Sequence, residues 1–106
     1  MSEKDLATIL ASFFEKNPQV SMGKHFNATS FLVGRKIFAF LRKEGGVVLK
    51  LPKAKADELV QKNYALPLVM GKRVMKEWVV IVHSDPEEYK QDKELFRQAL
   101  AFVRSP

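Results

Sequence analysis

Apolar positions near the start of the chain follow a helical period. They recur at i, i+3, i+4, i+7 and i+8, which places them on one face of a helix. These positions are Leu6, Ile9, Leu10, Phe13 and Phe14. Asn17 and Pro18 come next, and proline cannot continue a helix. The pattern therefore predicts an amphipathic helix that ends before residue 17.

The period then shortens to that of β-strands. Three β-rich runs lie around residues 30–33, 36–42 and 47–51. Gly34-Arg35 separates the first two runs and Gly45-Gly46 precedes the third, and glycine reaches the positive φ that tight hairpins need. These runs predict an antiparallel meander, which an extended arm at residues 20–26 could join.

The second half of the chain returns to a helix and then to strands. Pro52 fits the first turn of a helix, where its missing N–H is no loss. The apolar stripe of this helix is Ala56, Leu59 and Val60. Two further strands are predicted near residues 66–70 and 75–83, with Gly71 in the turn between them.

Residues 85–104 predict a last helix with a strong start signal. Asp85 fits the cap, Pro86 the first turn and Glu88 the third position of a capping box. The inward-facing positions are Phe96, Ala99, Leu100 and Val103. This helix completes the element order of helix, three strands, helix, two strands, helix.

These elements predict an α+β fold. We expect a two-layer α/β sandwich with a five-stranded antiparallel sheet, formed by residues 1–106 as one domain. A chain of this length buries roughly 60 to 68% of its unfolded surface, which gives a core without disulfides.

Both faces of two predicted strands are apolar. Ile37, Ala39 and Leu41 alternate with Phe38 and Phe40. In the same way, Trp78, Val80 and Val82 alternate with Val79 and Ile81. Three helices cover one face of such a sheet well and the second face only in part, so an apolar strip remains for a homodimer or a protein partner. The candidate interface residues are Phe38, Phe40, Val79 and Ile81. The alternative is a helix that straddles the second face.

The net charge of +6 is concentrated in the middle of the chain. Residues 24–76 hold twelve Lys and Arg against three Asp and Glu, a local balance of +9. Such a field attracts anionic partners, although a lysine-rich surface also serves solubility alone. No apolar run approaches about 18 residues and no export signal is visible, so we expect a cytoplasmic protein without a membrane segment. Zero cysteines fit a reducing compartment.

Several stretches resemble the N-terminal domain of the TfoX family, which is similar in fold to MmcQ/YjbR proteins. They are "VGRKIFAFL", "GGVVLKLP", "MGKRVMKEWVVI" and "ALAFV". The most specific pattern is Gly71, Arg73, Met75 and Trp78 before an apolar strand. The resemblance spans about residues 20–104 and implies the same two-layer α/β domain. TfoX regulators have a second domain, so their regulatory role is not carried over.

Trp78 and Lys50 each allow two interpretations. Trp78 either packs its ring on the domain, with Met75 beside it, or forms an aromatic floor among cations, as in proteins that hold single-stranded nucleic acid. Lys50 is either an edge lysine that prevents aggregation or an anion contact. The candidate anion contacts are Arg35, Lys36, Lys50, Lys72, Arg73, Lys76 and Trp78.

Enzyme signatures are missing from the sequence. His25 and His83 are far apart, and no ligand spacing such as His-x-x-x-His occurs, so we expect no metal and no cofactor. Neighbours in "HSD" point to opposite faces of a strand and do not form a triad. A deep cleft in which a histidine meets carboxylates would contradict this interpretation.

Two functions remain. The first is a small non-enzymatic interaction domain that binds a protein partner or itself through the sheet face. The second is a sequence-nonspecific nucleic-acid-binding domain that uses the basic central segment. Convergence of the cations on one side of the fold would favour the second function.

Overall fold

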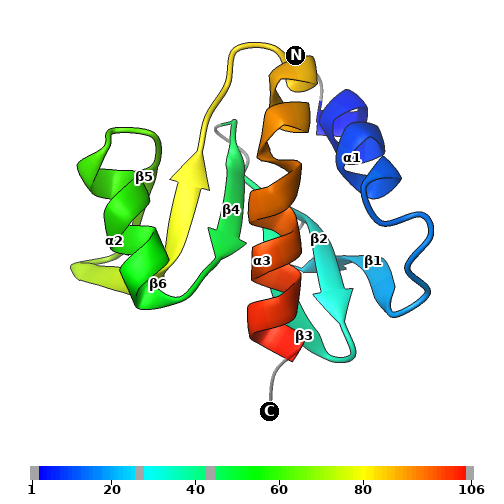
Figure 1. Ribbon diagram of the computed structural model, residues 1–106, viewed down its shortest axis with the longest axis horizontal. Helices are drawn as coiled ribbons and strands as arrows, with labels where there is room; N and C mark the ends of the chain where they lie inside the picture. The colour runs from blue at the N-terminus through cyan, green and yellow to red at the C-terminus, as the bar shows by residue number, and fades with distance from the viewer. Residues whose placement is uncertain (1–2, 26–27, 43–44, 105–106) are drawn as a thin grey trace.

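The computed structural model describes residues 3–25, 28–42 and 45–104, and Figure 1 shows their arrangement. The α-helices are α1 (Glu3–Ser12), α2 (Lys53–Gln61) and α3 (Lys93–Arg104), with a 3-10 helix, η1 (Pro86–Asp92), before the last. The strands are β1 (Val20–His25), β2 (Ala28–Val33), β3 (Lys36–Leu41), β4 (Val47–Lys50), β5 (Leu66–Met70) and β6 (Arg73–Ile81). Among the described residues, no helix is long and apolar enough to cross a bilayer.

All six strands form one antiparallel sheet in the order β1-β2-β3-β4-β6-β5. The predicted α+β class is confirmed, but the predicted count of five strands is wrong, because β1 pairs with β2 along its whole length. An outer strand is held by its backbone ladder and needs few apolar side chains. The order before α2 is therefore one helix and four strands, and the last helical region divides into η1 and α3.

The three α-helices bury one face of the sheet. Helix α3 packs against β2, β3 and β4, whereas α2 packs against β5 and β6. Figure 1 shows α3 across the middle of the sheet with α1 and α2 to either side. From the sheet this core takes Phe31, Phe38, Ala39, Leu41, Val47, Leu49, Val79 and Ile81. The opposite face of the sheet has no helix over it among the described residues.

Strand β3 contains one extra residue, which changes the direction of its side chains. Ile37 pairs with Leu32 and Ala39 pairs with Phe31, so Phe38 has no partner of its own on β2. Such a bulge breaks the simple alternation of faces. Phe38 is consequently buried in the helix-side core, with its ring centroid 5.3 Å from that of Phe14. The predicted alternation across residues 37–41 is therefore wrong at its first two positions.

Strand β6 has a larger irregularity opposite β5. Val79 pairs with Pro67 and Met75 pairs with Leu68, so residues 76–78 have no counterpart on β5. On its other side, β6 pairs with β4 only as far as Trp78, opposite Lys50. The outer part of the β5–β6 hairpin therefore extends beyond the end of β4.

The start of the last helical region agrees with its predicted signals. Asp85 and Glu88 form a capping box, and Pro86 occupies the first turn. The Glu87 N–H donates to Asp85 at 3.0 Å, and the Asp85 N–H donates to Glu88 at 3.1 Å. The predicted helix start is confirmed, although the first seven residues adopt the tighter 3-10 form.

Candidate binding face

The face of the sheet that points away from the helices is apolar. One row of register partners runs across it from β2 to β5: Ser30, Phe40, Val48, Val80 and Leu66. Ser30 is the only polar member, and Leu66 is more than half exposed. A sheet that faces water on one side normally carries polar residues there. Ser30, Val48 and Val80 are only 1%, 0% and 1% exposed, so the exposed apolar surface of this face lies at its border, at Leu66 and Met70. This face, which we call the open face, is therefore the candidate site.

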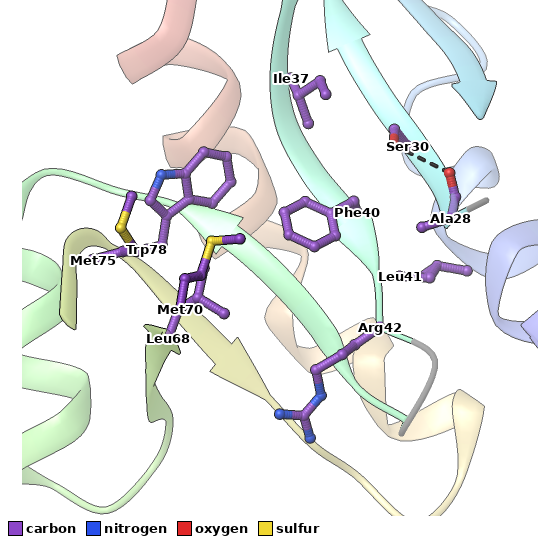
Figure 2. Close-up of a pocket in the computed structure, with 10 residues that line it drawn as sticks. All are labelled: Ala28, Ser30, Ile37, Phe40, Leu41, Arg42, Leu68, Met70, Met75 and Trp78. Atoms are coloured by element: carbon purple, nitrogen blue, oxygen red, sulfur yellow. Dashed lines mark hydrogen bonds between the residues drawn. The ribbon is translucent and has the colours of Figure 1, made fainter. Parts of the chain in front are cut away.

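A hollow of about 420 Å³ lies on the open face, and Figure 2 shows the side chains around it. Its lining residues are Ala28, Ser30, Ile37, Phe40, Leu41, Arg42, Leu68, Met70, Met75 and Trp78. Those of β2 and β3 lie on one side, and those of the β5–β6 hairpin lie on the other. Both strand irregularities contribute, because the bulge leaves Ile37 and Phe40 on this face and the offset places Leu68 beside Met75.

Trp78 and Lys50 meet at the border of the hollow. The Trp78 ring centroid is 5.7 Å from that of Phe40, and the Lys50 ammonium lies 5.4 Å from the indole centroid. A cation over an indole face is attracted by the ring quadrupole. Strand β4 lies inside the sheet between β3 and β6. The interpretation of Lys50 as an edge lysine is therefore wrong.

A second hollow of about 510 Å³, which we call the basic groove, adjoins the first. It is lined by Lys50, Lys53, Arg73, Val74, Met75, Lys76, Glu77 and Trp78. Lys53 is paired with Asp57 at 3.0 Å. Within residues 3–25, 28–42 and 45–104, no ion pair involves Lys50, Arg73 or Lys76. Trp78 and Met75 line both hollows and form the wall between them.

The structure brings together only part of the predicted anion-contact set. Lys50, Arg73, Lys76 and Trp78 converge on the basic groove. Arg35, Lys36 and Lys72 are exposed at hairpin turns and line neither hollow. In an antiparallel sheet, the β2–β3 turn, the end of β4 and the start of β6 share one end. All of these cations are therefore found toward the same end of the molecule.

The predicted interface residues divide between the two faces. Phe38, Val79 and Ile81 are buried in the helix-side core, so placing these three at an exposed interface was wrong. Phe40 alone is on the open face. Among the residues that sequence reasoning did not assign to a site are Ile37, Leu68 and Met70, and it placed Met75 beside Trp78 only as packing. The alternation of Leu68 and Met70 in the run "LPLVM" was the signal that could have indicated two of them.

A buried polar cluster lies at the opposite end of the sheet. His83 Nε2 is 2.7 Å from Asp92 Oδ2, and the Tyr64 hydroxyl donates to Asp92 Oδ1. The Tyr89 hydroxyl accepts from the His83 N–H and donates to the Ile81 carbonyl, both at 3.0 Å. Burial raises the pKa of Tyr89, and burial together with the Asp92 bond raises the pKa of Tyr64.

This cluster joins β6, η1 and the segment before β5. His83 does meet carboxylates, which the sequence did not predict, because its Nδ1 is also 4.0 Å from Glu88 Oε2. The side chains of His83 and Asp92 are only 11% and 2% exposed, so a substrate has little access to them. Ser84 donates to Glu88 at 3.0 Å and is part of the helix start rather than a nucleophile beside His83. The His25 side chain lies outside the described residues.

Across the described part of the chain, no three His, Cys, Asp or Glu side chains stand close enough to share an ion.

Comparison of the chain with protein-family models, with curated proteins and with solved structures returned no match.

Proposed function

We propose that this chain is a small non-enzymatic interaction domain that binds a protein partner through the open face. One observation carries the proposal: the open face is apolar, and none of the described helices covers it. Met70 and Leu66 are 60% and 54% exposed on or beside the hollow. Exposed apolar patches with polar rims mark interaction sites on soluble proteins.

The lining of the hollow suits side chains of a partner. Its volume of about 420 Å³ falls within the range of about 300 to 1,000 Å³ that is typical of small-molecule pockets, so it has room for an apolar side chain of a partner. Met70 and Met75 are flexible and adapt to different shapes, whereas Phe40 and Trp78 offer rigid aromatic surfaces. Aromatic residues and Met are enriched at the centres of protein interfaces, and Trp is enriched among the residues that contribute most of the binding energy.

Two neighbouring residues of β5 provide a matched test. Met70 lines the hollow, whereas Val69 is 53% exposed and lines neither hollow. Short peptides are selected from a random display library on the wild-type protein, and their affinities are measured by fluorescence anisotropy. We expect Met70→Glu to weaken binding at least about tenfold, or 1.4 kcal/mol, and Val69→Glu to leave it unchanged. Equal affinities for both variants would contradict the proposal.

Binding of single-stranded nucleic acid is a second candidate function. The observation that favours it is the grouping of Lys50, Arg73 and Lys76 around Trp78. Bases often stack on aromatic rings within such basic grooves. However, the Lys50 ammonium already lies over one face of the indole, where it competes with a stacked base. For this reason we rank protein binding first.

The resemblance to the TfoX N-terminal domain stays a prediction. The sheet is antiparallel and has a helical layer, as the resemblance implies, but it has six strands where five are implied. The proposed binding face depends on the residues of this chain and not on the family.

A further inference from the structure

We propose that the partner segment is an acidic peptide with an apolar anchor, the anchor occupying the hollow and its carboxylates contacting the basic groove. This inference rests on the proposed function and adds the chemistry of the partner. It joins two sites that would otherwise be separate, because an extended segment would cross Trp78 and Met75 to reach both.

The two hollows are adjacent parts of one surface because they share two lining residues. Trp78 and Met75 contribute to the lining of each. The apolar hollow lies toward β2 and β3, and the basic groove lies toward α2 and the start of β6. A bound peptide that extends from the hollow past Trp78 therefore reaches the cations of the basic groove within a few residues.

The basic groove carries an excess of positive charge, which favours an anionic ligand. Lys50, Arg73 and Lys76 take part in no ion pair within the described ranges, and Glu77 is the only acid in the lining. Lys50 is half-buried against Trp78. An ammonium that is partly removed from water interacts more strongly with a carboxylate than a fully exposed one does.

A second copy of the chain is a poorer occupant. In a symmetric dimer, both partners present the same patch to each other. A dimer centred on this surface would bring two sets of Lys50, Arg73 and Lys76 together, and like charges across an interface cost free energy. An acidic partner instead complements both the groove and the net charge of +6.

The test compares two double charge reversals with the same change in net charge. Arg73→Glu with Lys76→Glu removes groove cations, whereas Arg35→Glu with Lys36→Glu changes exposed cations outside both hollows. The probes are the library-selected peptides and versions with every Asp and Glu replaced by its amide. Circular dichroism and thermal melts verify that each variant is folded.

We expect selected peptides to combine large apolar residues with several acids. The groove variant should weaken their binding about tenfold or more, and the control variant by less than about threefold. The amide peptides should show the same loss on the wild-type protein. Binding should also weaken between about 50 and 200 mM salt, because part of it is electrostatic.

Other results would overturn the inference in distinguishable ways. Peptides without acids that bind the groove variant normally, yet lose affinity with Met70→Glu, would leave the proposed function standing and remove the acidic partner. Equal binding to Met70→Glu and Val69→Glu would remove both. Oligothymidine binding that persists at about 200 mM salt and needs the groove but not Met70 would favour nucleic acid. A wild-type dimer in sedimentation that Met70→Glu dissociates would identify a second copy as the occupant.

Discussion

Trp78 contributes to three hollows of the protein surface at once. Its ring lines the apolar hollow and the basic groove, and it also lines a depression between α2 and the β5–β6 hairpin. Phe40 and Lys50 approach it within the open face. The ring is therefore both part of the domain's packing and part of its surface, so the two interpretations from sequence do not exclude each other.

Tyr89 offers a test of the buried polar cluster. Its hydroxyl bonds both the Ile81 carbonyl and the His83 N–H, and Tyr89→Phe leaves these groups without that partner. We expect the free energy of unfolding at neutral pH to fall by about 1–3 kcal/mol. Urea denaturation measures this change, and an unaltered midpoint would show that water replaces the hydroxyl.

The pH dependence of the same variant follows from the raised pKa of Tyr89. In the folded state the pKa of Tyr89 is raised above its ordinary value of 10.0. The stability that the protonated hydroxyl contributes is therefore complete below about pH 10 and is lost as the pH rises further. Tyr89→Phe should therefore lose less stability than the wild type between neutral pH and alkaline pH. If the free energy of unfolding falls equally in both proteins between neutral and alkaline pH, the raised pKa of Tyr89 is contradicted.

At the scale of elements, the β3 bulge decides which phenylalanine belongs to the core. Phe38→Ala removes a fully buried ring and should destabilise the protein by about 3–5 kcal/mol. Phe40→Ala removes a half-buried ring on the open face and should cost about 1–2 kcal/mol. Chemical denaturation of both variants compares the two faces. Equal losses would mean that the bulge is absent in solution.

The turn before β4 gives a second test at this scale. Gly45 and Gly46 have φ of 101° and 97°, but only at Gly46 would a Cβ come within 3.1 Å of the Ile81 carbonyl oxygen. Both substitutions by alanine carry a backbone cost of roughly 1–2 kcal/mol. Gly46→Ala adds a steric clash with β6, so its melting temperature should be clearly lower than that of Gly45→Ala. Identical melting temperatures would contradict the close approach.

At the scale of the whole molecule, the six predicted cationic contacts lie toward one end of the sheet, whereas Arg42 and the buried His83 cluster lie toward the other. We expect oligothymidine to bind weakly at about 50 mM salt and to dissociate by about 200 mM. Replacing Lys50, Arg73 and Lys76 by alanine should reduce the slope of log K against log salt by about 2, since each phosphate contact contributes about 0.7. Tight binding at physiological salt would instead raise nucleic acid above protein as the partner.

The sequence predicted much of this architecture because its signals were local. Hydrophobic period, hairpin glycines and the Asp85 capping box placed most elements within a few residues. Strand β1 was uncertain because its mixed side chains follow no clear alternation, and its place is fixed by backbone pairing with β2. Such pairing leaves no trace in the composition of a single strand.

The candidate site was only half predictable for a related reason. The basic residues and Trp78 stood out by type, but their grouping depends on the offset in β6. The apolar half was assigned to the wrong side chains, because both alternating sets of β3 are apolar and only the bulge determines which set faces outward. Side-chain identity thus indicated the chemistry, whereas strand irregularities decided its position.

Pro67 in the outermost strand has a consequence for how this protein behaves when crowded. Strand β5 is an edge strand of the sheet, and its side chains are apolar and mostly exposed. An edge of this kind is a template for the growth of fibrils. A proline has no N–H to offer to an incoming strand, so it interrupts the ladder that a growing fibril needs. The β5–β6 hairpin can therefore expose an apolar surface to a partner without templating the aggregation of further copies of this chain.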